Sequence, residues 1–350
     1  MMQNSRRRPV VLHVTECFEG GVGKAIRSYA DNTDAFEHQL LAVGNDVDDE
    51  RNLSRFARVT DLEDGLWKRV SQIRQIASAG GADLIHAHSS WAGVYARLRS
   101  MSVPIVYEPH GYAFEMASRV RRLSYFSAER LLGLRRIAAT AVLSPREELL
   151  ARTVSPGSSV ILIPNSPTIA RYLSDPAEAL IRPAPIITMI GRVCAQKDPE
   201  YFVRLLEEVR VGIPDARGRW IGDGDFHAVE VLKAAGVEVT GWRDPKSLTA
   251  KLDETSVYVH TAQYEGFPLS VLDAAARRVP IHARAIPAFD GSPIAQHLTV
   301  RDHADAVVRT VEDPEHRASI VSLGEELLAL MNSSEQENKL TTLYRRAMQR

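Results

Sequence analysis

Basic side chains follow the strand predicted over Ile186–Ile190. Arg192 and Lys197 lie on the loop that leads from this strand to the next helix. Two cations beside a helix N-terminus suit the binding of a diphosphate. Gly222 follows the next strand and gives the backbone freedom to approach a ligand. A solvated turn is the ordinary alternative for each loop alone, but two such loops at successive strand ends favour a ligand site.

A second candidate site is the segment EGFPLSVLD, residues 265–273. A helix is predicted over Pro268–Arg277, because proline suits a first helical turn. The first amides of this helix would point at a ligand, and the carboxylates of Glu265 and Asp273 could bind two sets of hydroxyls, as on a sugar and a ribose. A capped helix with both carboxylates in water is the alternative. The candidate ligand-binding residues are Glu265, Gly266, Phe267, Pro268, Leu269 and Asp273.

Three histidines of the first half lie close to predicted strand ends. His110 follows the strand Pro104–Tyr107, and its imidazole could hydrogen-bond a phosphate or a sugar hydroxyl. The alternative is that His110 is an ordinary loop histidine that caps a group close to it. His86 and His88 alternate at another strand end, but a metal site would need a third ligand, and no acidic partner has a metal-site spacing. We expect them to have a structural role at the edge of the sheet, and we expect no metal.

Glycines separate the strand predicted over Val10–Thr15 from a helix predicted over Gly23–Asn32. Gly21 and Gly23 either let the backbone approach an anionic ligand or form a plain turn, and the sequence favours neither interpretation. The nearby lysine resembles that of a nucleoside triphosphatase, but that chemistry needs a hydroxyl where Ala25 stands.

Short apolar runs alternate with helical patterns along both halves of the chain, which predicts parallel sheets covered on both faces. The prolines of Pro164–Pro185 interrupt the alternation and indicate an interdomain connection. We therefore predict an α/β fold of two doubly wound domains that face each other across a cleft. The expected domains are 1–165, 166–333 and a C-terminal helix over 334–350 that returns to the first domain.

Composition limits the class of protein. Among the 350 residues, 43 are Lys or Arg and 44 are Asp or Glu, so the net charge of −1 argues against nucleic-acid binding. No apolar run approaches the ~18 residues of a membrane span, and no secretory signal is recognisable. Two cysteines exclude a disulfide scaffold and a cysteine-rich zinc site. We expect a cytoplasmic protein.

The segment Met116–Ile137 has apolar residues at helical spacing and six arginines against Glu129 alone. A basic amphipathic helix of this kind could lie on an anionic membrane surface, which would make the protein peripheral at the inner face of the membrane. The commoner alternative is an apolar stripe that packs on the sheet, with the arginines in water.

The sequence resembles the retaining glycosyltransferases of family 4, which have the two-domain GT-B fold. The E-x7-E signature of that family, similar to residues 265–273, is the most discriminating motif. The matching segments extend over almost the full chain and are Gly20–Gly23, DLIHAHSS at 83–90, PHGYAF at 109–114, IPN at 163–165, GR and QK within 191–197, GDG at 222–224 and YEGFPLSVLD at 264–273.

This resemblance implies transfer of a sugar from a nucleotide-diphosphate sugar, favouring UDP over GDP, to a glycan or lipid-linked acceptor in cell-surface polysaccharide or glycolipid synthesis. It implies that Arg192 and Lys197 hold the diphosphate, that Glu265 binds the sugar and that Asp273 binds the ribose. It places His110 near the donor phosphate and sugar. No cofactor and no metal are expected.

Three departures from the family pattern leave a second function open. Asp273 replaces the second glutamate, Arg277 and Arg278 replace a small residue and a glycine, and Ala283–Gly291 lacks the usual glycine-rich segment. A catalytically weak GT-B subunit that binds another glycosyltransferase is therefore the first alternative. A membrane-associated triphosphatase is the second, and Ala25 argues against it.

Overall fold

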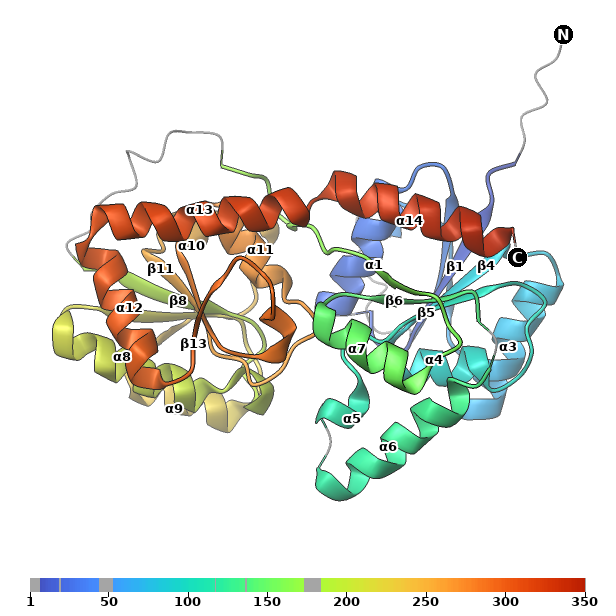
Figure 1. The fold of residues 1–350 in the computed structure, drawn as a ribbon, viewed down its shortest axis with the longest axis horizontal. Coiled ribbons are helices and arrows are strands. Elements are labelled where there is room, and N and C mark those ends of the chain that lie inside the picture. The colour runs from blue at the N-terminus through green and yellow to red at the C-terminus, as the bar shows by residue number, and fades with distance from the viewer. Residues whose placement is uncertain are drawn as a thin grey trace, which may run out of the picture. The chain divides into compact units, whose positions relative to one another are not determined.

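The computed structural model describes residues 7–18, 20–43, 53–116, 118–135, 137–172 and 184–349, apart from the side chains of Met116 and Arg119. The chain divides into two compact units. Unit 1 comprises Met1–Asn165 and Ser333–Arg350, and unit 2 comprises Ser166–Asn332. Each unit is a parallel sheet with helices on both faces, so the predicted α/β class with two doubly wound sheets is confirmed (Figure 1).

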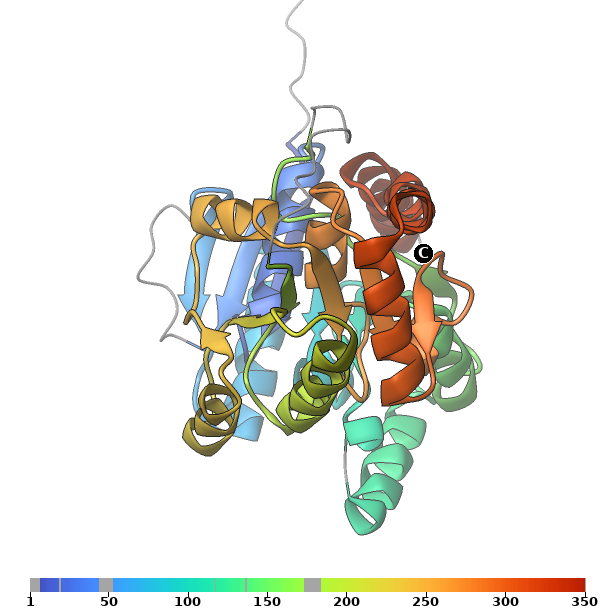
Figure 2. The ribbon, with the colours of Figure 1, turned by 90° about the vertical axis from the view of Figure 1, so that its left-hand side faces the viewer.

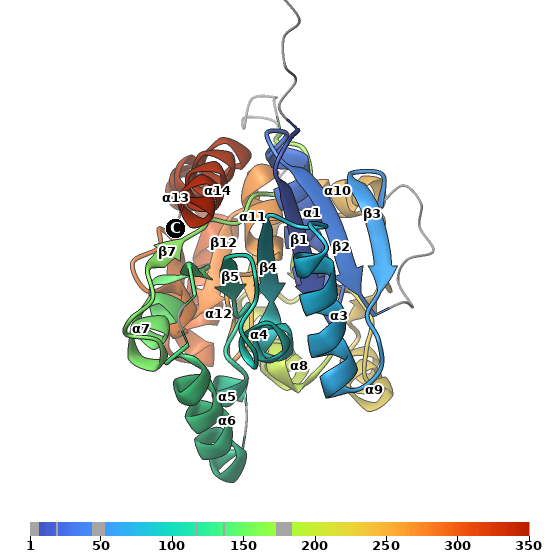
Figure 3. The same cartoon turned by 90° about the vertical axis from the view of Figure 1, so that its right-hand side faces the viewer.

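Unit 1 has a seven-stranded sheet of order β3-β2-β1-β4-β5-β6-β7. Its strands are β1 Val10–Thr15, β2 Glu37–Ala42, β3 Phe56–Asp61, β4 Leu84–His88, β5 Ile105–Glu108, β6 Ala139–Val142 and β7 Val160–Leu162. Its helices are α1 Gly20–Asn32, α3 Leu66–Ser78, α4 Ser89–Arg97, α5 Ala113–Met116, α6 Arg119–Leu132, α7 Pro145–Val154 and α14 Ser333–Met348. Figure 3 shows α3 and α4 in front of the strands.

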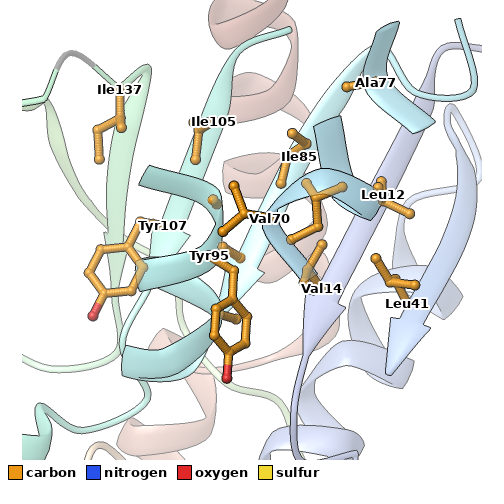
Figure 4. Close-up of a cluster of buried hydrophobic side chains, with 14 of the residues drawn as sticks. Leu12, Val14, Leu41, Val70, Ala77, Ile85, Tyr95, Ile105, Tyr107 and Ile137 are labelled. Carbon is orange, nitrogen blue, oxygen red and sulfur yellow. The ribbon is translucent and has the colours of Figure 1, made fainter. Parts of the chain in front are cut away.

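Apolar residues alternate between the two faces of this sheet, and each face is covered. Leu12 and Val14 point toward α3 and α4, where they join the cluster drawn in Figure 4. Val11 points the other way and packs with Tyr344 of α14. Each such side chain contributes about 1.5–3 kcal/mol when it is fully buried. The C-terminal helix is therefore part of the core of unit 1.

Unit 2 has a six-stranded sheet of order β10-β9-β8-β11-β12-β13. Helices α8, α9 and α12 lie along one face, and α10, α11 and α13 lie along the other (Figures 1 and 2). Its strands are β8 Ile186–Ile190, β9 Arg217–Ile221, β10 Glu238–Val239, β11 Val257–His260, β12 Ile281–Arg284 and β13 Ala295–His297. Its helices are α8 Pro199–Gly212, α9 Phe226–Ala234, α10 Pro245–Asp253, α11 Leu269–Ala276, α12 Val300–Glu312 and α13 Pro314–Leu330.

Both sheets reverse their strand order once, between β1 and β4 in unit 1 and between β8 and β11 in unit 2. Ligands of open parallel sheets bind outside the carboxyl ends of the strands at such a reversal. In unit 2 the loops at this position are 191–198 and 261–268, which contain most of the residues that the sequence singled out.

Several expected element boundaries are wrong. Helix α1 begins at Gly20 rather than Gly23, so the glycines form its first turn instead of a preceding loop. Helix α11 begins at Leu269, and Pro268 is its N-cap. Strand β4 is central in its sheet, so the expected position of His86 and His88 at the sheet edge is also wrong.

Helix α6 does not pack its apolar stripe on the sheet, which contradicts the commoner of the two interpretations of Met116–Ile137. Val120, Leu123 and Leu131 are 83%, 72% and 69% exposed. Glu129 is buried instead, and it accepts hydrogen bonds from Arg97 and from the Tyr107 hydroxyl, each at 2.8 Å. Figure 3 shows α6 at the periphery of unit 1. Residues 117 and 136 of this segment lie outside the described residues.

None of the helices in the described ranges has both the length and the apolarity to span a bilayer.

The two glycines of α1 provide a matched test of its packing. A Cβ at Gly23 would overlap the carbonyl of Phe18, whereas a Cβ at Gly21 would meet no atom within 4 Å. We expect Gly23→Ala to lower the free energy of unfolding by about 3 kcal/mol, the upper range for overpacking. Gly21→Ala should be neutral or stabilising by up to about 1 kcal/mol. Chemical denaturation measures both, and equal stabilities of the two variants would contradict this packing.

Candidate active site

The centre of the unit 2 site is an ion pair between the loops after β8 and β11. The ammonium group of Lys197 contacts Oε1 of Glu265, and the two side chains are only 14% and 10% exposed. Nε2 of His260 lies 3.3 Å from the same oxygen. The side-chain amide of Gln196 donates to the backbone carbonyl of Tyr264 at 2.9 Å. These contacts join two loops that are 68 residues apart in the sequence.

Glycines at the strand ends make this pairing sterically possible. Gly191 has a φ of +149°, and a Cβ there would lie 3.1 Å from Cε of Lys197, so the lysine stem passes where a side chain would otherwise be. A Cβ at Gly222 would overlap the carbonyl of Gly191. The same carbonyl accepts a hydrogen bond from Nε1 of Trp220 at 2.8 Å. Gly222 therefore has a packing role in the structure, and its role in ligand binding stays a prediction.

The charge of Glu265 is fixed by its neighbours. Burial by itself would raise the pKa of this carboxyl, but the Lys197 ammonium and the His260 imidazole outweigh burial and lower the pKa to about 2. Burial lowers the pKa of His260, against the opposing effect of Glu265. At neutral pH Glu265 is therefore a carboxylate and His260 a neutral imidazole, which the Tyr258 hydroxyl also contacts at 2.9 Å.

The N-terminus of α11 adds backbone donors at the same strand ends. Pro268 is the N-cap and provides no side-chain hydrogen bond to the first amides. Uncapped amides at a helix N-terminus favour an anionic ligand. Phe267 is buried against Phe289, which holds the turn before the helix. Arg192 is exposed on the loop that also contains Lys197. The fold therefore gathers Arg192, Lys197, Glu265, Gly266, Phe267, Pro268 and Leu269 on two neighbouring loops.

Asp273 lies one turn further along α11, and its side chain is buried. Its Oδ1 accepts from the backbone amide of Thr168 at 2.6 Å, and its Oδ2 accepts from the Thr168 hydroxyl at 2.8 Å. This carboxylate therefore fastens the first residues of unit 2 to α11. Ribose binding stays a prediction, and a ribose would share oxygens that already accept hydrogen bonds.

The two arginines that depart from the family pattern have structural partners. Arg277 binds Asp253 through two hydrogen bonds of 2.7 and 2.9 Å. Arg278 pairs with Glu325 at 2.8 Å and has a φ of +57°, a conformation that glycine adopts without strain. Both follow the C-terminus of α11, at the opposite end from Glu265. Neither arginine therefore lies on the two loops that form the candidate site.

In unit 1, His110 lies just beyond the carboxyl end of β5. Its φ of +51° is rare for a residue other than glycine, and strained backbone of this kind is concentrated at functional sites. Its Nε2 lies 3.0 Å from Nδ1 of His88. The amide of Gly111 donates to Glu147 at 2.5 Å, which fixes the turn.

Sequence reasoning missed two acidic residues here. Glu108, the last residue of β5, is buried near His88 and His110; its Oε1 accepts from the Tyr29 hydroxyl at 2.7 Å, and its Oε2 lies 3.1 Å from Nε2 of His86. Glu16 follows β1 and accepts from the Ser89 hydroxyl at 2.7 Å, and burial raises its pKa. Ser89 has a φ of +83°. Both glutamates directly follow or end a strand, which is the signal that could have identified them.

Two groups of described residues have the geometry to hold a metal ion. One consists of His13, His86 and His88, and the other of His88, Glu108 and His110. The fold therefore supplies a third candidate ligand that the sequence did not reveal, because neighbouring parallel strands bring these side chains together.

The pKa of Glu265 predicts a pH-dependent contribution to stability. Because this pKa is depressed from 4.5 to about 2 in the folded chain, the ionised carboxylate stabilises the fold above pH 4.5, and the effect fades as the pH falls toward 2. We expect Glu265→Gln to lower the free energy of unfolding by about 3 kcal/mol at pH 7 and by clearly less at pH 3.5. Urea denaturation at both pH values measures the difference.

The matched control is Glu238→Gln, which removes a half-exposed partner of Arg219 and should cost less than about 1 kcal/mol. A loss at Glu265 that is equal at both pH values would contradict the assigned ion pair.

Comparison with known proteins identifies two family domains. Residues 20–166 match the family described as "Glycosyl transferase 4-like domain". Residues 184–316 match the family described as "Glycosyl transferases group 1". Together these ranges include the predicted site residues of both units.

A curated relative is the UDP-Gal:alpha-D-GlcNAc-diphosphoundecaprenol alpha-1,3-galactosyltransferase of Escherichia coli, which is 26% identical over 227 residues. This match covers 57% of the chain and spans only 56% of the length of that enzyme. Among solved structures, the sucrose-phosphate synthase of Thermosynechococcus elongatus is 19% identical with a TM-score of 0.80, and covers 97% of this chain and 98% of its own.

The Anabaena protein HepE, solved in complex with UDP and glucose, is 17% identical with a TM-score of 0.77 and covers 96% of this chain and 99% of its own. At these identities the solved structures establish the fold alone. With the two domain families, they show that the chain belongs to the glycosyltransferases of the GT-B fold, and family 4 is consistent with both matches.

Proposed function

We propose that the chain transfers a hexosyl group from a nucleotide-diphosphate sugar to a glycan or lipid-linked acceptor, with retention of anomeric configuration. The observation that carries the proposal is the grouping of Arg192, Lys197 and Glu265 with the uncapped N-terminus of α11 at the strand reversal of unit 2. This grouping offers positive charge for a diphosphate and a carboxylate for sugar hydroxyls.

The leaving nucleotide diphosphate gains negative charge on its β-phosphate. Positive groups and helix dipoles that are already in place stabilise such charge without reorganisation. Arg192 and Lys197 provide the positive charge. Lys197 is already paired with Glu265, so a bound diphosphate shares this ammonium with the carboxylate. This shared arrangement positions the phosphate and the sugar against one another.

Glu265 orients the sugar through its hydroxyls rather than by attacking the anomeric carbon. Its low pKa keeps it ionised, and Oε1 contacts both Lys197 and His260. A carboxylate held in this way accepts hydrogen bonds well and is a poor nucleophile. Departure of the diphosphate and attack of the acceptor from the same face then give retention. Asp273 completes the donor site by binding the ribose.

The donor and acceptor classes are proposed from the relatives. The name of the Escherichia coli enzyme contains a UDP-sugar donor and a diphosphoundecaprenol acceptor, and HepE was solved with UDP and glucose. We therefore favour a UDP-sugar donor and a lipid-linked or glycan acceptor in cell-surface polysaccharide or glycolipid synthesis. The residues described above require no metal ion for this proposal.

Helix α6 would hold the chain at an anionic membrane surface, where a lipid-linked acceptor resides. Its exposed surface combines apolar and basic side chains, and its one acid, Glu129, is buried on Arg97. This surface consists of α6 and the residues just after it. Its described basic residues are Arg121, Arg122, Arg130 and Arg135. Each cation near an anionic bilayer adds about 1 kcal/mol, and the exposed leucines add apolar insertion.

The diphosphate site is tested by removing each cation. We expect Arg192→Ala and Lys197→Ala each to lower kcat/KM for the nucleotide sugar by about 100-fold, because each variant removes a positive charge that stabilises the leaving diphosphate. Arg204→Ala, an exposed arginine of α8, is the control and should retain wild-type activity. Transfer of radiolabelled sugar measures all three variants. Activity within threefold of wild type for both site variants would refute the assignment.

Membrane binding is tested by cosedimentation with vesicles. We expect pelleting with anionic vesicles at low salt, and loss of most of this binding when the four arginines Arg121, Arg122, Arg130 and Arg135 become glutamine. The matched control changes four exposed arginines of unit 2 to glutamine, namely Arg204, Arg217, Arg301 and Arg309. If both quadruple variants lose vesicle binding equally, the binding is a nonspecific effect of positive charge and not a property of α6. If the wild-type protein does not pellet with the vesicles, a soluble acceptor is favoured.

A further inference from the structure

Four buried imidazoles of unit 1 form one continuous chain of nitrogen contacts that ends at His110. Nε2 of His110 lies 3.0 Å from Nδ1 of His88, and Nε2 of His88 lies 2.9 Å from Nδ1 of His13. Nε2 of His13 lies 3.0 Å from Nδ1 of His38. Every link therefore joins an Nε2 to the next Nδ1. Parallel strands β1, β2 and β4 place His13, His38 and His88 side by side.

The far end of this chain fixes the direction of its hydrogen bonds. Nε2 of His38 lies 3.0 Å from Oγ1 of Thr33 and 3.2 Å from the Thr33 carbonyl, which can only accept. The Thr33 hydroxyl donates its hydrogen to the carbonyl of Tyr29 at 2.6 Å, so its oxygen is also an acceptor toward His38. Nε2 of His38 must therefore be protonated.

The remaining tautomers follow one after another. A neutral imidazole has one N–H and one lone pair, so protonation of Nε2 in His38 leaves its Nδ1 as an acceptor. His13 must then donate from Nε2, and the same reasoning applies to His88 and finally to His110. Burial keeps these rings neutral: it lowers the pKa of His13 and His88 well below the usual value and that of His38 to about 4. Burial also lowers the pKa of His110, against the opposing effect of Glu108.

We propose that His38, His13 and His88 act as positioning residues that hold His110 as the Nε2–H tautomer, so that its Nδ1 presents a lone pair to the substrate. This proposal deepens the proposed function and rests on it for the identity of the substrate. An unprotonated nitrogen accepts a hydrogen bond from a hydroxyl and repels a phosphate oxygen. The side chain of His110 therefore recognises a sugar hydroxyl, whereas the sequence left both a phosphate and a hydroxyl open.

The competing arrangement is a metal ion on His88, Glu108 and His110. Nδ1 of His88 and Nε2 of His110 would then both have to present lone pairs to the ion, and His110 would be protonated on Nδ1 instead. The two arrangements therefore predict opposite tautomers of the same ring. The hydrogen-bond chain accounts for the 3.0 Å separation of these two nitrogens without an ion.

The test is the tautomer of His110 in the full chain, read by nitrogen-15 NMR of labelled histidines and assigned with His110→Gln. We expect Nε2 to be protonated in the wild type, with no stoichiometric metal in the purified protein. Nδ1 protonation, or a stoichiometric metal whose removal changes the tautomer, would overturn the proposal.

Variants of His38 test the direction of the hydrogen bonds between the histidines, because His38 is at the opposite end of the series from His110. His38→Leu removes the acceptor of His13, so we expect a mixture of His110 tautomers and a loss of about tenfold in kcat/KM. His38→Asn provides an amide oxygen close to the former Nδ1, so it should restore one tautomer and most of the activity. The control is His282→Leu in unit 2, a buried histidine that contacts His297 at 2.9 Å and Thr310 at 2.8 Å. It should leave the His110 signal unchanged.

An unchanged His110 tautomer in His38→Leu would also overturn the proposal, and if that variant does not fold, the wild-type spectrum still decides it. The tautomer is measured without a sugar donor. If the spectra show that Nε2 of His110 is protonated, but the protein transfers no sugar from any nucleotide sugar, the proposed function fails and the tautomer assignment stands.

Discussion

In both sheets all strand pairs among the described residues are parallel, so all carboxyl ends of a sheet lie along one of its edges. Side chains that follow different strands are thereby brought together, however distant they are in the sequence. At the reversal between β8 and β11, this constraint places Lys197 beside Glu265. Within unit 1, the same constraint places Glu16 beside Ser89 and His88 beside His110, at the ends of strands that are neighbours in that sheet.

Buried titratable side chains are stabilised differently in the two candidate sites. Glu265 remains charged because Lys197 and His260 compensate the cost of burial. His13, His38 and His88 in unit 1 remain neutral because burial lowers their pKa values, and they contact one another through their ring nitrogens. A charged site suits a diphosphate and sugar hydroxyls, and a neutral chain of imidazoles suits the recognition of a single hydroxyl.

The sequence predicted the doubly wound fold because buried parallel strands are continuous apolar runs, as in Ile186–Ile190. It missed β3 and β13, which are edge strands. β3 is mostly exposed, and β13 has only three residues, so neither shows a clear pattern. The site residues were recognisable by motif, but the pairing of Lys197 with Glu265 depends on packing between distant loops. The exposed apolar side chains of α6 were also unpredictable, because periodicity shows a stripe and not what covers it.

The most direct test of the central claim is hydrogen exchange of the full chain with and without saturating UDP. Bound diphosphate should cover the strand ends at the reversal of unit 2. We predict slower amide exchange in peptides spanning 191–198 and 265–271, while peptides from the distal half of α8 and from α13 remain unchanged. Slower exchange confined to other segments, with no effect at either loop, would contradict the account of where this glycosyltransferase binds its donor.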